Sequence, residues 1–480
     1  MPRAGTSGKS ELFSQKPRVT KPEGLLALAS LLLLMTIQGW PSLNQLAAVA
    51  YCHCAIVAAL TAVAAKQALS GAPPGKVLLM VSIFLYFSLE AALSATNDFS
   101  SSHALAPSTM VPHNIQRALQ YLCSCTPIAL LGYSIQIRTP SLVRRWLQRE
   151  DARSAFKWKL RYILGALTFT PLLMQQTGDS FSGILRQLQA SRTVTLVGDD
   201  TGLLIHLAHI GLAAASLVLA EGCAHRGYRR ILLATLGVMC LLPHLSRGTR
   251  HFTVIALLPA VFVLLADRRR KMQLLVAVVA VLILMQVQYV IRDKGWNSID
   301  ADAILEAQSR TAVTGQFESL VQSVALVPAQ HDYFRESMSV LFITHNIPRR
   351  WWENKPISES WLEFNRAYLP AEALTTSNLT PSILGQYHMN WGVLGVVFVS
   401  LGVGVSARLL DNSVQAIRPR QQLALVVVLG MLYGVFVASF RYLHPLYFVY
   451  PQAAALIFFA LTSPHRKSST CRSHRSRQRL

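Results

Sequence analysis

Long apolar runs separated by short polar breaks dominate the chain. A bilayer core about 30 Å thick is crossed by about twenty residues of helix at a rise of about 1.5 Å each. Most runs reach or approach this length, and a helix satisfies its own backbone groups inside lipid. The pattern predicts an all-α, polytopic integral membrane protein with about twelve transmembrane helices. The runs cover residues 23–40, 45–66, 76–95, 117–137, 161–177, 201–220, 230–245, 251–266, 272–292, 383–407, 423–440 and 446–463.

One polar break is far longer than the others, and loops of that length are uncommon unless they are functional or disordered. Its many aromatic residues and its apolar periodicity near 318–327 and 338–343 argue against disorder. We expect short helices on the outer leaflet, with aromatic rings that either anchor at the interface or stack on sugars. The expected parts are a basic cytoplasmic tail (1–22), a membrane bundle of about nine spans (23–292), a large periplasmic loop (293–382), about three further spans (383–463) and a second basic cytoplasmic tail (464–480).

Composition and charge support this class. The chain is 52% hydrophobic and only 14% charged, whereas a soluble domain carries about a quarter charged residues. Lys and Arg number 45 against 23 Asp and Glu, for a net charge of +22, which raises nucleic acid as a partner. The basic residues, however, lie in the two tails and in every second short loop. This distribution excludes a nucleic-acid binder and places both termini in the cytoplasm.

Metal and disulfide chemistry have little support in the pattern. None of the seven cysteines falls in an external loop, so we expect no disulfide framework. Neighbours in Cys52-His53-Cys54 point in different directions on a helix, which indicates packing rather than a metal site. Asp300-Ala301-Asp302 is interpreted as a solvated loop. We therefore expect neither a metal nor another cofactor.

Two external turns carry arginines against the positive-inside rule. Arg247 and Arg250 lie in the turn between the seventh and eighth spans, and Arg441 lies between the last two. An arginine near the bilayer is costly unless it meets an anion or a cavity. The N–H groups of its planar guanidinium are spaced to form paired hydrogen bonds with phosphate oxygens. Snorkelling to lipid phosphates is the alternative.

Polar residues also gather where the tenth span begins. Gln386, Tyr387, His388 and Asn390 are predicted to line a cavity there, and the following glycines allow close helix approach. Glu90, in the outer part of the third span, is a functional candidate by its position in the membrane. A hydrogen-bonded structural role for Glu90 is an equal alternative.

Together these residues resemble the oligosaccharide repeat-unit polymerase family, the Wzy-type O-antigen and exopolysaccharide polymerases, which are related to the O-antigen ligases. The resemblance covers the last half of the chain, and the first half matches only as a run of spans. It rests on the turn at 246–250, on the stretch from Asn346 to Trp352 followed by Lys355-Pro356, on the segment from Thr380 to Gly395 and on Arg441.

The resemblance implies a glycosyltransferase-C-like enzyme of the bacterial inner membrane, with its active site facing the periplasm. It implies a growing glycan on undecaprenyl pyrophosphate as donor and a lipid-linked repeat unit as acceptor, among membrane lipids. A chain-length regulator and a flippase are the further partners that such a pathway suggests. An O-antigen ligase and a lipid-linked oligosaccharide flippase or transporter remain alternatives, although no internal repeat typical of transporters is visible.

In this reading the leaving group is a pyrophosphate, whose negative charge grows as the glycosidic bond breaks. Preorganised cations lower such a barrier, so Arg247 and Arg441 are predicted to be catalytic without a metal. Glu318 is the first candidate for the base that activates the acceptor hydroxyl, because some relatives have an acid before a similar apolar helix; Glu363 and His388 follow. The residues predicted to bind substrate are Arg250, Arg310, Arg349, Arg350, Tyr387, His388 and Asn390.

Overall fold

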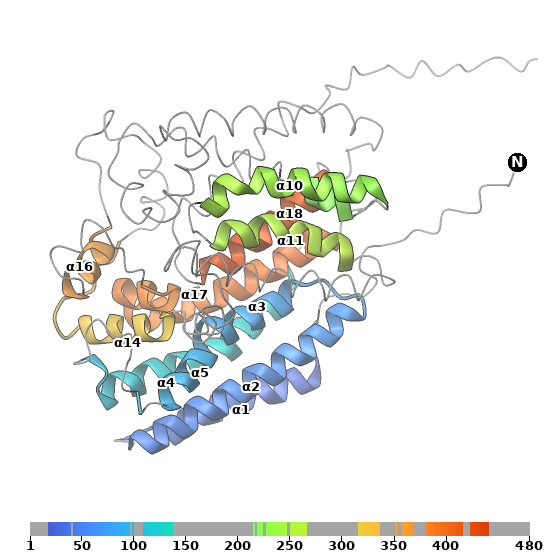
Figure 1. Ribbon diagram of the computed structural model, residues 1–480. Helices are drawn as coiled ribbons and strands as arrows, with labels where there is room; N and C mark the ends of the chain where they lie inside the picture. The colour runs from blue at the N-terminus through green and yellow to red at the C-terminus, as the bar shows by residue number, and fades with distance from the viewer. Residues whose placement is uncertain are drawn as a thin grey trace, which may run out of the picture.

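The structure is a computed structural model of the chain, and its regular elements are all helices within the residues that it describes (Figure 1). This part of the expected fold class is confirmed. The described residues are 18–39, 42–96, 98–99, 109–137, 215–216, 218–223, 227–246, 250–265, 315–336, 352, 358–368, 381–415 and 423–440.

The described helices follow the apolar runs closely, apart from two short helices within the expected loop at 293–382. The runs at 161–177, 272–292 and 446–463 lie outside the described residues, so the full number of spans stays a prediction. The elements are α1 (Lys21–Thr36), α2 (Leu43–Leu69), α3 (Gly75–Ile83), the π-helical turn η1 (Phe84–Ser88), α4 (Leu89–Thr96), α5 (Pro112–Ser134), α10 (Tyr228–Ser246), α11 (Arg250–Leu265), α14 (Gln316–Leu326), α16 (Glu359–Tyr368), α17 (Ile383–Gln415) and α18 (Leu423–Ser439).

Local sequence explains where several helices begin. Ser42 caps α2 by accepting a hydrogen bond from the backbone N–H of Gln45 at 3.3 Å. The Gln45 side chain accepts in return from the backbone N–H of Ser42 at 2.8 Å, which completes a capping box. α5 begins with Pro112, whose fixed φ suits the first helical turn.

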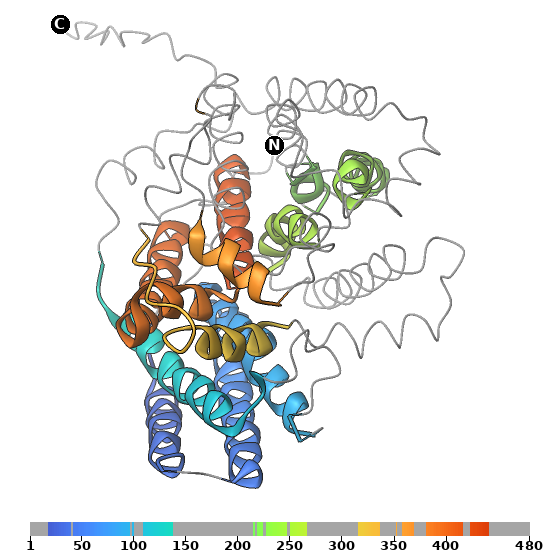
Figure 2. The ribbon, with the colours of Figure 1, turned by 90° about the vertical axis from the view of Figure 1, so that its left-hand side faces the viewer.

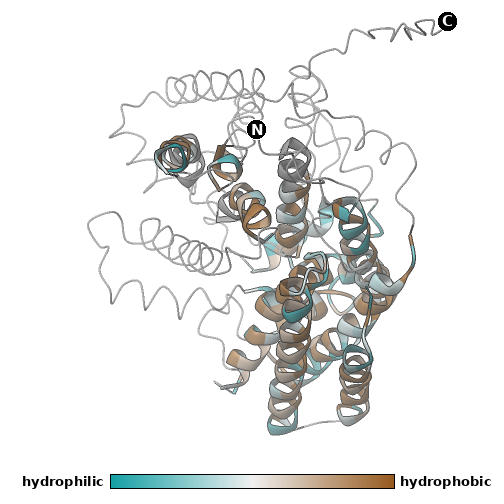
Figure 3. Cartoon of the chain, turned by 90° about the vertical axis from the view of Figure 1, so that its right-hand side faces the viewer, coloured by the Kyte–Doolittle hydropathy of each residue, from teal (hydrophilic) through white to brown (hydrophobic). Residues whose placement is uncertain are grey.

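Three helical segments of the described chain are long and apolar enough to cross a membrane: α2, the continuous stretch Gly75–Thr96, and α17. Hydrophobic residues make up much of the described helices (Figure 3), and many of the large ones are exposed. On α17, for example, Leu394 and Phe398 are each 66% exposed. A helix that is apolar on its outer face as well as its inner face is typical of a membrane protein.

The core of the molecule is the contact between α5 and α17, which run side by side through the bundle (Figure 2). Two glycines allow this approach. A Cβ atom at Gly404 would lie 1.9 Å from the carbonyl oxygen of Ala129, and one at Gly132 would lie 2.3 Å from that of Leu401. Small residues at such crossings let two backbones pack directly against each other, which is how membrane helices associate.

A second group of helices packs beside this core. α11 lies along α18, and the rings of Phe262 and Tyr433 are 4.9 Å apart at their contact. α10 lies on the far side of α11 (Figure 1). α17 contacts both groups and joins them into one bundle.

Candidate functional site

The long loop contributes a helix to the interior of the bundle. Every residue of α14 is buried, and the helix packs against α4, α5 and α17 (Figures 1 and 2). The expected short helix near 318–327 is therefore confirmed. It lies inside the protein rather than on the outer leaflet, because the surrounding helices cover both its polar and its apolar side chains.

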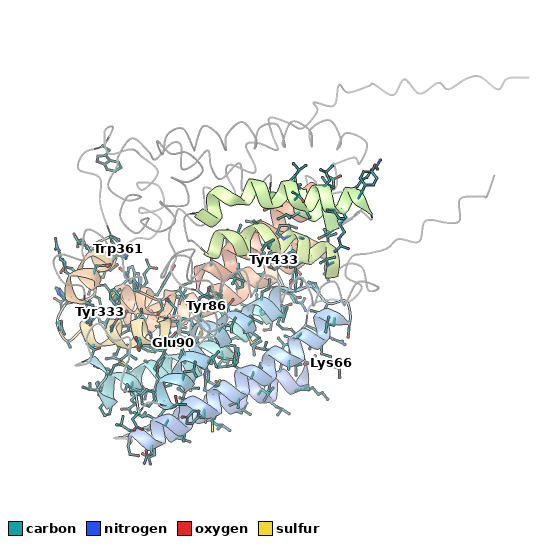
Figure 4. All side chains as sticks on the ribbon, viewed as in Figure 1. Lys66, Tyr86, Glu90, Tyr333, Trp361 and Tyr433 are labelled. Atoms are coloured by element: carbon teal, nitrogen blue, oxygen red, sulfur yellow. The ribbon has the colours of Figure 1, made fainter. Side chains whose placement is uncertain are left out.

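Glu90 holds the first turn of α14 from the N-terminal part of the chain (Figure 4). Its carboxylate accepts hydrogen bonds from the backbone N–H groups of Gln316 at 2.8 Å and Glu318 at 3.3 Å. The residue before the helix, Gly315, has φ 73° and no side chain to cap these groups. A carboxylate at a helix N-terminus satisfies free N–H groups and complements the helix dipole. Of the two roles considered for Glu90, the hydrogen-bonded one is present.

Glu318, the first candidate for a general base, is 7% exposed and lies in this same first turn. Because Glu90 binds its backbone N–H, the position of Glu318 depends on a residue from another helix. The two acids thus share the start of α14, at the end of the bundle that also contains Tyr121 and His388. We call this region, defined by Glu90, Tyr121, Glu318 and His388, the Glu90 end.

The chain reverses direction at Gly392, so α17 consists of two helices. Gly392 has φ 61° and ψ −141°, a conformation that favours glycine. A Cβ atom at Gly395 would lie 2.1 Å from the carbonyl oxygen of Tyr387, although residues eight apart in a straight helix are separated by about 12 Å along the axis. Residues 383–391 therefore fold back on the long helix that follows. The expected close approach at these glycines is confirmed.

His388 lies in this folded-back segment and is fully buried. Its Nε2 lies 2.9 Å from the carbonyl oxygen of Val327, and its Nδ1 lies 3.0 Å from the hydroxyl of Tyr121. The carbonyl can only accept, so Nε2 donates, and Nδ1 of the neutral ring accepts from Tyr121. Both ring nitrogens are thus engaged within the protein, which makes His388 a residue that joins α5, α14 and α17.

Asn390 fixes the same segment to the loop. Its amide nitrogen donates to the carbonyl of Gln386 at 2.9 Å, and its amide oxygen accepts from the backbone N–H of Glu336 at 2.8 Å. The Glu336 carboxylate in turn accepts from the hydroxyls of Ser358 at 3.0 Å and Ser360 at 2.6 Å, just before and within α16. This network joins residues 383–391 to Glu336 and to the start of α16.

The other residues predicted to form the site fall in two groups. Tyr387 is half-buried at the folded-back segment, and Glu363 pairs with Arg366 on α16 at 2.5 Å. Arg250 begins α11, but its side chain is not described. The residues that lie outside the described part of the chain are Arg247, Arg310, Arg349, Arg350 and Arg441.

Arg117 is a cation of the Glu90 end that the sequence reasoning missed. It lies near the start of α5, part-buried and one turn before Tyr121 on the same helix. The available signal was a single arginine at the outer edge of an otherwise apolar run, the same departure from the positive-inside rule that marks Arg247 and Arg441.

A second buried polar cluster occupies the opposite end of the bundle. The Asp411 carboxylate accepts hydrogen bonds from Tyr133 at 2.5 Å, Tyr433 at 2.6 Å and the backbone N–H of Gly75 at 2.7 Å. Nearby, Lys76 pairs with Glu23 at 2.7 Å, and both side chains are almost completely buried. These contacts tie the ends of α1, α3, α5 and α17 to the middle of α18.

The Cys52-His53-Cys54 stretch has the packing role that its spacing predicts. Cys52 is exposed, Cys54 is half-buried, and His53 is buried against α5, with Nε2 3.3 Å from the hydroxyl of Thr126. Within the described residues, no group of three or more His, Cys, Asp or Glu side chains is placed to hold a metal ion.

Residues 175–444, more than half of the chain, match a protein family described as a domain of unknown function (DUF8712). The chain belongs to this family. No curated protein and no solved structure matches it. The DUF8712 segment contains all the residues predicted to be catalytic or to bind substrate, together with α14 and α17, but not the candidate Glu90. Glu90, Arg117 and Tyr121 precede the segment, so the Glu90 end is built from the DUF8712 domain and the helices before it.

Proposed function

We propose that this DUF8712 protein is an inner-membrane polysaccharide polymerase. It transfers a growing glycan from undecaprenyl pyrophosphate to a lipid-linked repeat unit at the periplasmic face. Arginines, rather than a metal ion, stabilise the leaving pyrophosphate. The active site is proposed at the Glu90 end of a glycosyltransferase-C-like bundle of about twelve spans.

The observation that carries the proposal is the insertion of α14 and residues 383–391 into the Glu90 end. Short and interrupted helices at membrane depth are tolerated where they are buried in protein or line a cavity, and they are often functional. Here α14, which carries the buried Glu318, packs against α5, the helix that carries Arg117. An acid and a cation held by separate helices are the pair that a metal-free glycosyl transfer needs.

The proposed reaction follows from these groups. The Glu318 carboxylate takes the proton of the acceptor hydroxyl, whose oxygen attacks the anomeric carbon of the donor sugar. The bond from that carbon to the pyrophosphate oxygen breaks, and undecaprenyl pyrophosphate leaves with the electron pair. Arg247 and Arg441 face the growing negative charge and lower the barrier.

A deletion strain tests this function. Loss of the gene should reduce surface glycan to single-repeat products, and the wild-type gene should restore long chains. Arg247→Ala and Arg441→Ala should fail to restore them, whereas Arg366→Ala, which removes an exposed arginine already paired with Glu363, should succeed. Full restoration by stable Arg247→Ala and Arg441→Ala variants would contradict the assignment of these arginines.

The same strain separates the alternatives. A polymerase defect leaves single-repeat glycan on the surface, because export and ligation still operate. Absence of single-repeat glycan as well would instead favour an O-antigen ligase or a flippase. Analysis of the glycan ladder by gel electrophoresis distinguishes these outcomes directly.

A further inference from the structure

Two residues predicted to bind substrate are closed off in this structure. His388 is fully buried and Asn390 is 1% exposed, so a lipid-linked sugar cannot reach either side chain. Access to such residues requires part of the protein to move aside. The helices α5, α14 and α17 pack against one another in the bundle. A short segment held by few bonds opens at a lower cost than packed helices, so the segment that crosses these residues is the part that moves most easily.

Residues 332–336 form this segment, which we call the strap. They follow α14, have neither helical nor strand structure, and cross the folded-back part of α17. The backbone N–H of Phe334 donates to the carbonyl of Met389 at 3.2 Å, and that of Arg335 donates to the carbonyl of Asn390 at 3.3 Å. The strap is therefore bound to the end of the folded-back segment through its own backbone.

The side chain of Asn390 adds a third bond to the strap. Its amide oxygen accepts from the backbone N–H of Glu336 at 2.8 Å, while its amide nitrogen donates to the carbonyl of Gln386 at 2.9 Å. The bond to Gln386 fixes the direction of the amide. Asn390 thus binds two successive N–H groups of the strap, one with its main chain and one with its side chain.

Two aromatic rings of the strap cover the buried residues beneath it. The ring of Tyr333 stands edge-on to that of His388, with 6.2 Å between their centroids. A Cβ atom at Gly392 would lie 3.0 Å from the hydroxyl of Tyr333, so the phenol rests directly on the reversal of α17. Phe334 packs against the buried cluster that contains Met389. Lifting the strap therefore uncovers both His388 and Met389.

The closed strap holds Arg335 in a strained backbone conformation. Its φ is 54°, in the left-handed region, where a residue with a Cβ atom is disfavoured. The side chain of Arg335 is exposed, so the bonds of the strap to Asn390 are what hold this conformation. Strained residues persist where the surrounding contacts over-determine them, and they cluster at clamps and switch regions. Here the hydrogen bonds favour the closed strap and the strain favours its release.

We propose that the strap is a lid, which opens by release from Asn390 and admits substrate to the buried face of residues 383–391, where His388 lies. The identification of that substrate as a lipid-linked glycan rests on the proposed function. The opening itself is a property of the fold and can be measured without catalysis. In the open state Phe334 leaves the buried cluster, so the sulfur of Met389 becomes accessible.

Methionine oxidation measures this opening in the purified full-length protein in lipid nanodiscs. Hydrogen peroxide transfers one oxygen atom to an accessible thioether sulfur, which gives the sulfoxide and water. Peptide mass spectrometry follows Met389, and Met80, a 1% exposed residue of α3, is the internal control. Asn390→Ala removes the acceptor of the Glu336 N–H and should raise the rate at Met389 by about three- to tenfold, the equivalent of one net hydrogen bond. The rate at Met80 should not change.

Arg335 offers a second set of variants that leave the buried residues intact. Arg335→Val places a β-branched side chain at a positive φ and should speed oxidation of Met389. Arg335→Gly removes the strain and should give a rate no higher than that of wild type. Asp332→Ala, at an exposed residue of the strap that makes none of the bonds to Asn390, is the matched control and should match wild type.

Equal oxidation of Met389 in wild type, Asn390→Ala and Arg335→Val overturns the lid, with thermal unfolding curves showing that the variants are folded. Faster oxidation in Arg335→Gly than in Arg335→Val overturns it as well. So does a parallel rise at Met80, because the whole bundle then opens rather than the strap. The deletion strain judges the proposed function separately. Long chains made without the gene overturn the polymerase and leave the lid in place, whereas single-repeat glycan with unchanged Met389 oxidation in the variants overturns only the lid.

Discussion

The backbone N–H of Glu318 donates a hydrogen bond of 3.3 Å to the carboxylate of Glu90, across 228 residues of sequence. The other oxygen of that carboxylate accepts from Gln316 at 2.8 Å. One acid from the N-terminal helices therefore defines where the loop helix α14 begins. The geometry of the candidate site depends on both halves of the chain.

Glu90→Ala should destabilise the protein and loosen α14 first. The change leaves the two N–H groups without this acceptor in a buried setting, at a cost of about 1–3 kcal/mol each. Hydrogen exchange at the start of α14 should accelerate more than exchange in α2. Glu363→Ala, which removes a partly exposed acid from a surface pair on α16, is the matched control and should leave exchange in α14 unchanged. Equal protection of α14 in Glu90→Ala and wild type would count against the capping role.

Gly404→Ala should weaken the α5–α17 contact. Its new Cβ would lie 1.9 Å from the Ala129 carbonyl, so the two helices must separate, and overpacking of this kind costs about 1–3 kcal/mol. Gly402→Ala, on the same helix with nothing within 4 Å of its Cβ, should leave stability unchanged or raise it. Thermal unfolding in detergent measures both. A Gly404→Ala variant as stable as Gly402→Ala would show that the contact adjusts freely.

The helices could be predicted from the sequence because the bilayer imposes a length and an apolar composition that a single run displays. α2 and the long part of α17 follow directly from their runs. Which helices pack against each other could not be predicted in this way. The sequence identifies Glu90 only as an acid within an expected span. Its hydrogen bond to the backbone N–H of Gln316 depends on the packing of α14, which the sequence does not reveal.

The candidate site was partly visible in the sequence. The glycines after Asn390 indicated close helix approach, but the reversal at Gly392 depends on a backbone conformation that composition does not reveal. Glu318 and His388 are predicted as site residues from residue type and neighbourhood. Arg117 belongs to an early span, whereas the family resemblance covers only the later half of the chain, so the resemblance does not point to it.

Asp411→Asn should destabilise the opposite end of the bundle. The carboxylate accepts three hydrogen bonds, whereas an amide turns one acceptor into a donor that faces a hydroxyl or an N–H group. The expected loss is about 1–3 kcal/mol in the free energy of unfolding. Ser413→Ala, two residues away, removes only a bond to its own helix and should be nearly neutral. Denaturant titration compares the two variants, and similar midpoints would argue against a stabilising cluster.

Tyr368 should make docking of α16 sensitive to high pH. Its hydroxyl donates to the Gln322 carbonyl at 2.7 Å, and burial raises the pKa of Tyr368 above its ordinary value of 10.0. The folded state therefore keeps a proton that the unfolded state loses, so this stabilisation is present below about pH 10 and falls as pH rises further. Tyr368→Phe should be less stable than wild type by about 1 kcal/mol at pH 8, and the gap should narrow above pH 10. Tyr228→Phe, at a site 74% exposed, should match wild type at both values. A gap that does not change with pH would contradict the titration of Tyr368.

Glu318→Gln should abolish long glycan chains without unfolding α14. Glutamine keeps the size of the side chain and the backbone N–H that binds Glu90, but it cannot take a proton from the acceptor hydroxyl. Loss of a general base lowers the rate by about 10²–10⁴-fold. Expressed in the deletion strain, the variant should yield single-repeat glycan, whereas Glu359→Gln, which changes an exposed acid of α16, should restore full chains. Normal protein levels and unchanged hydrogen exchange in α14 would attribute the loss to chemistry. Long chains made by Glu318→Gln would move the base to another residue, with Glu363 the next to test.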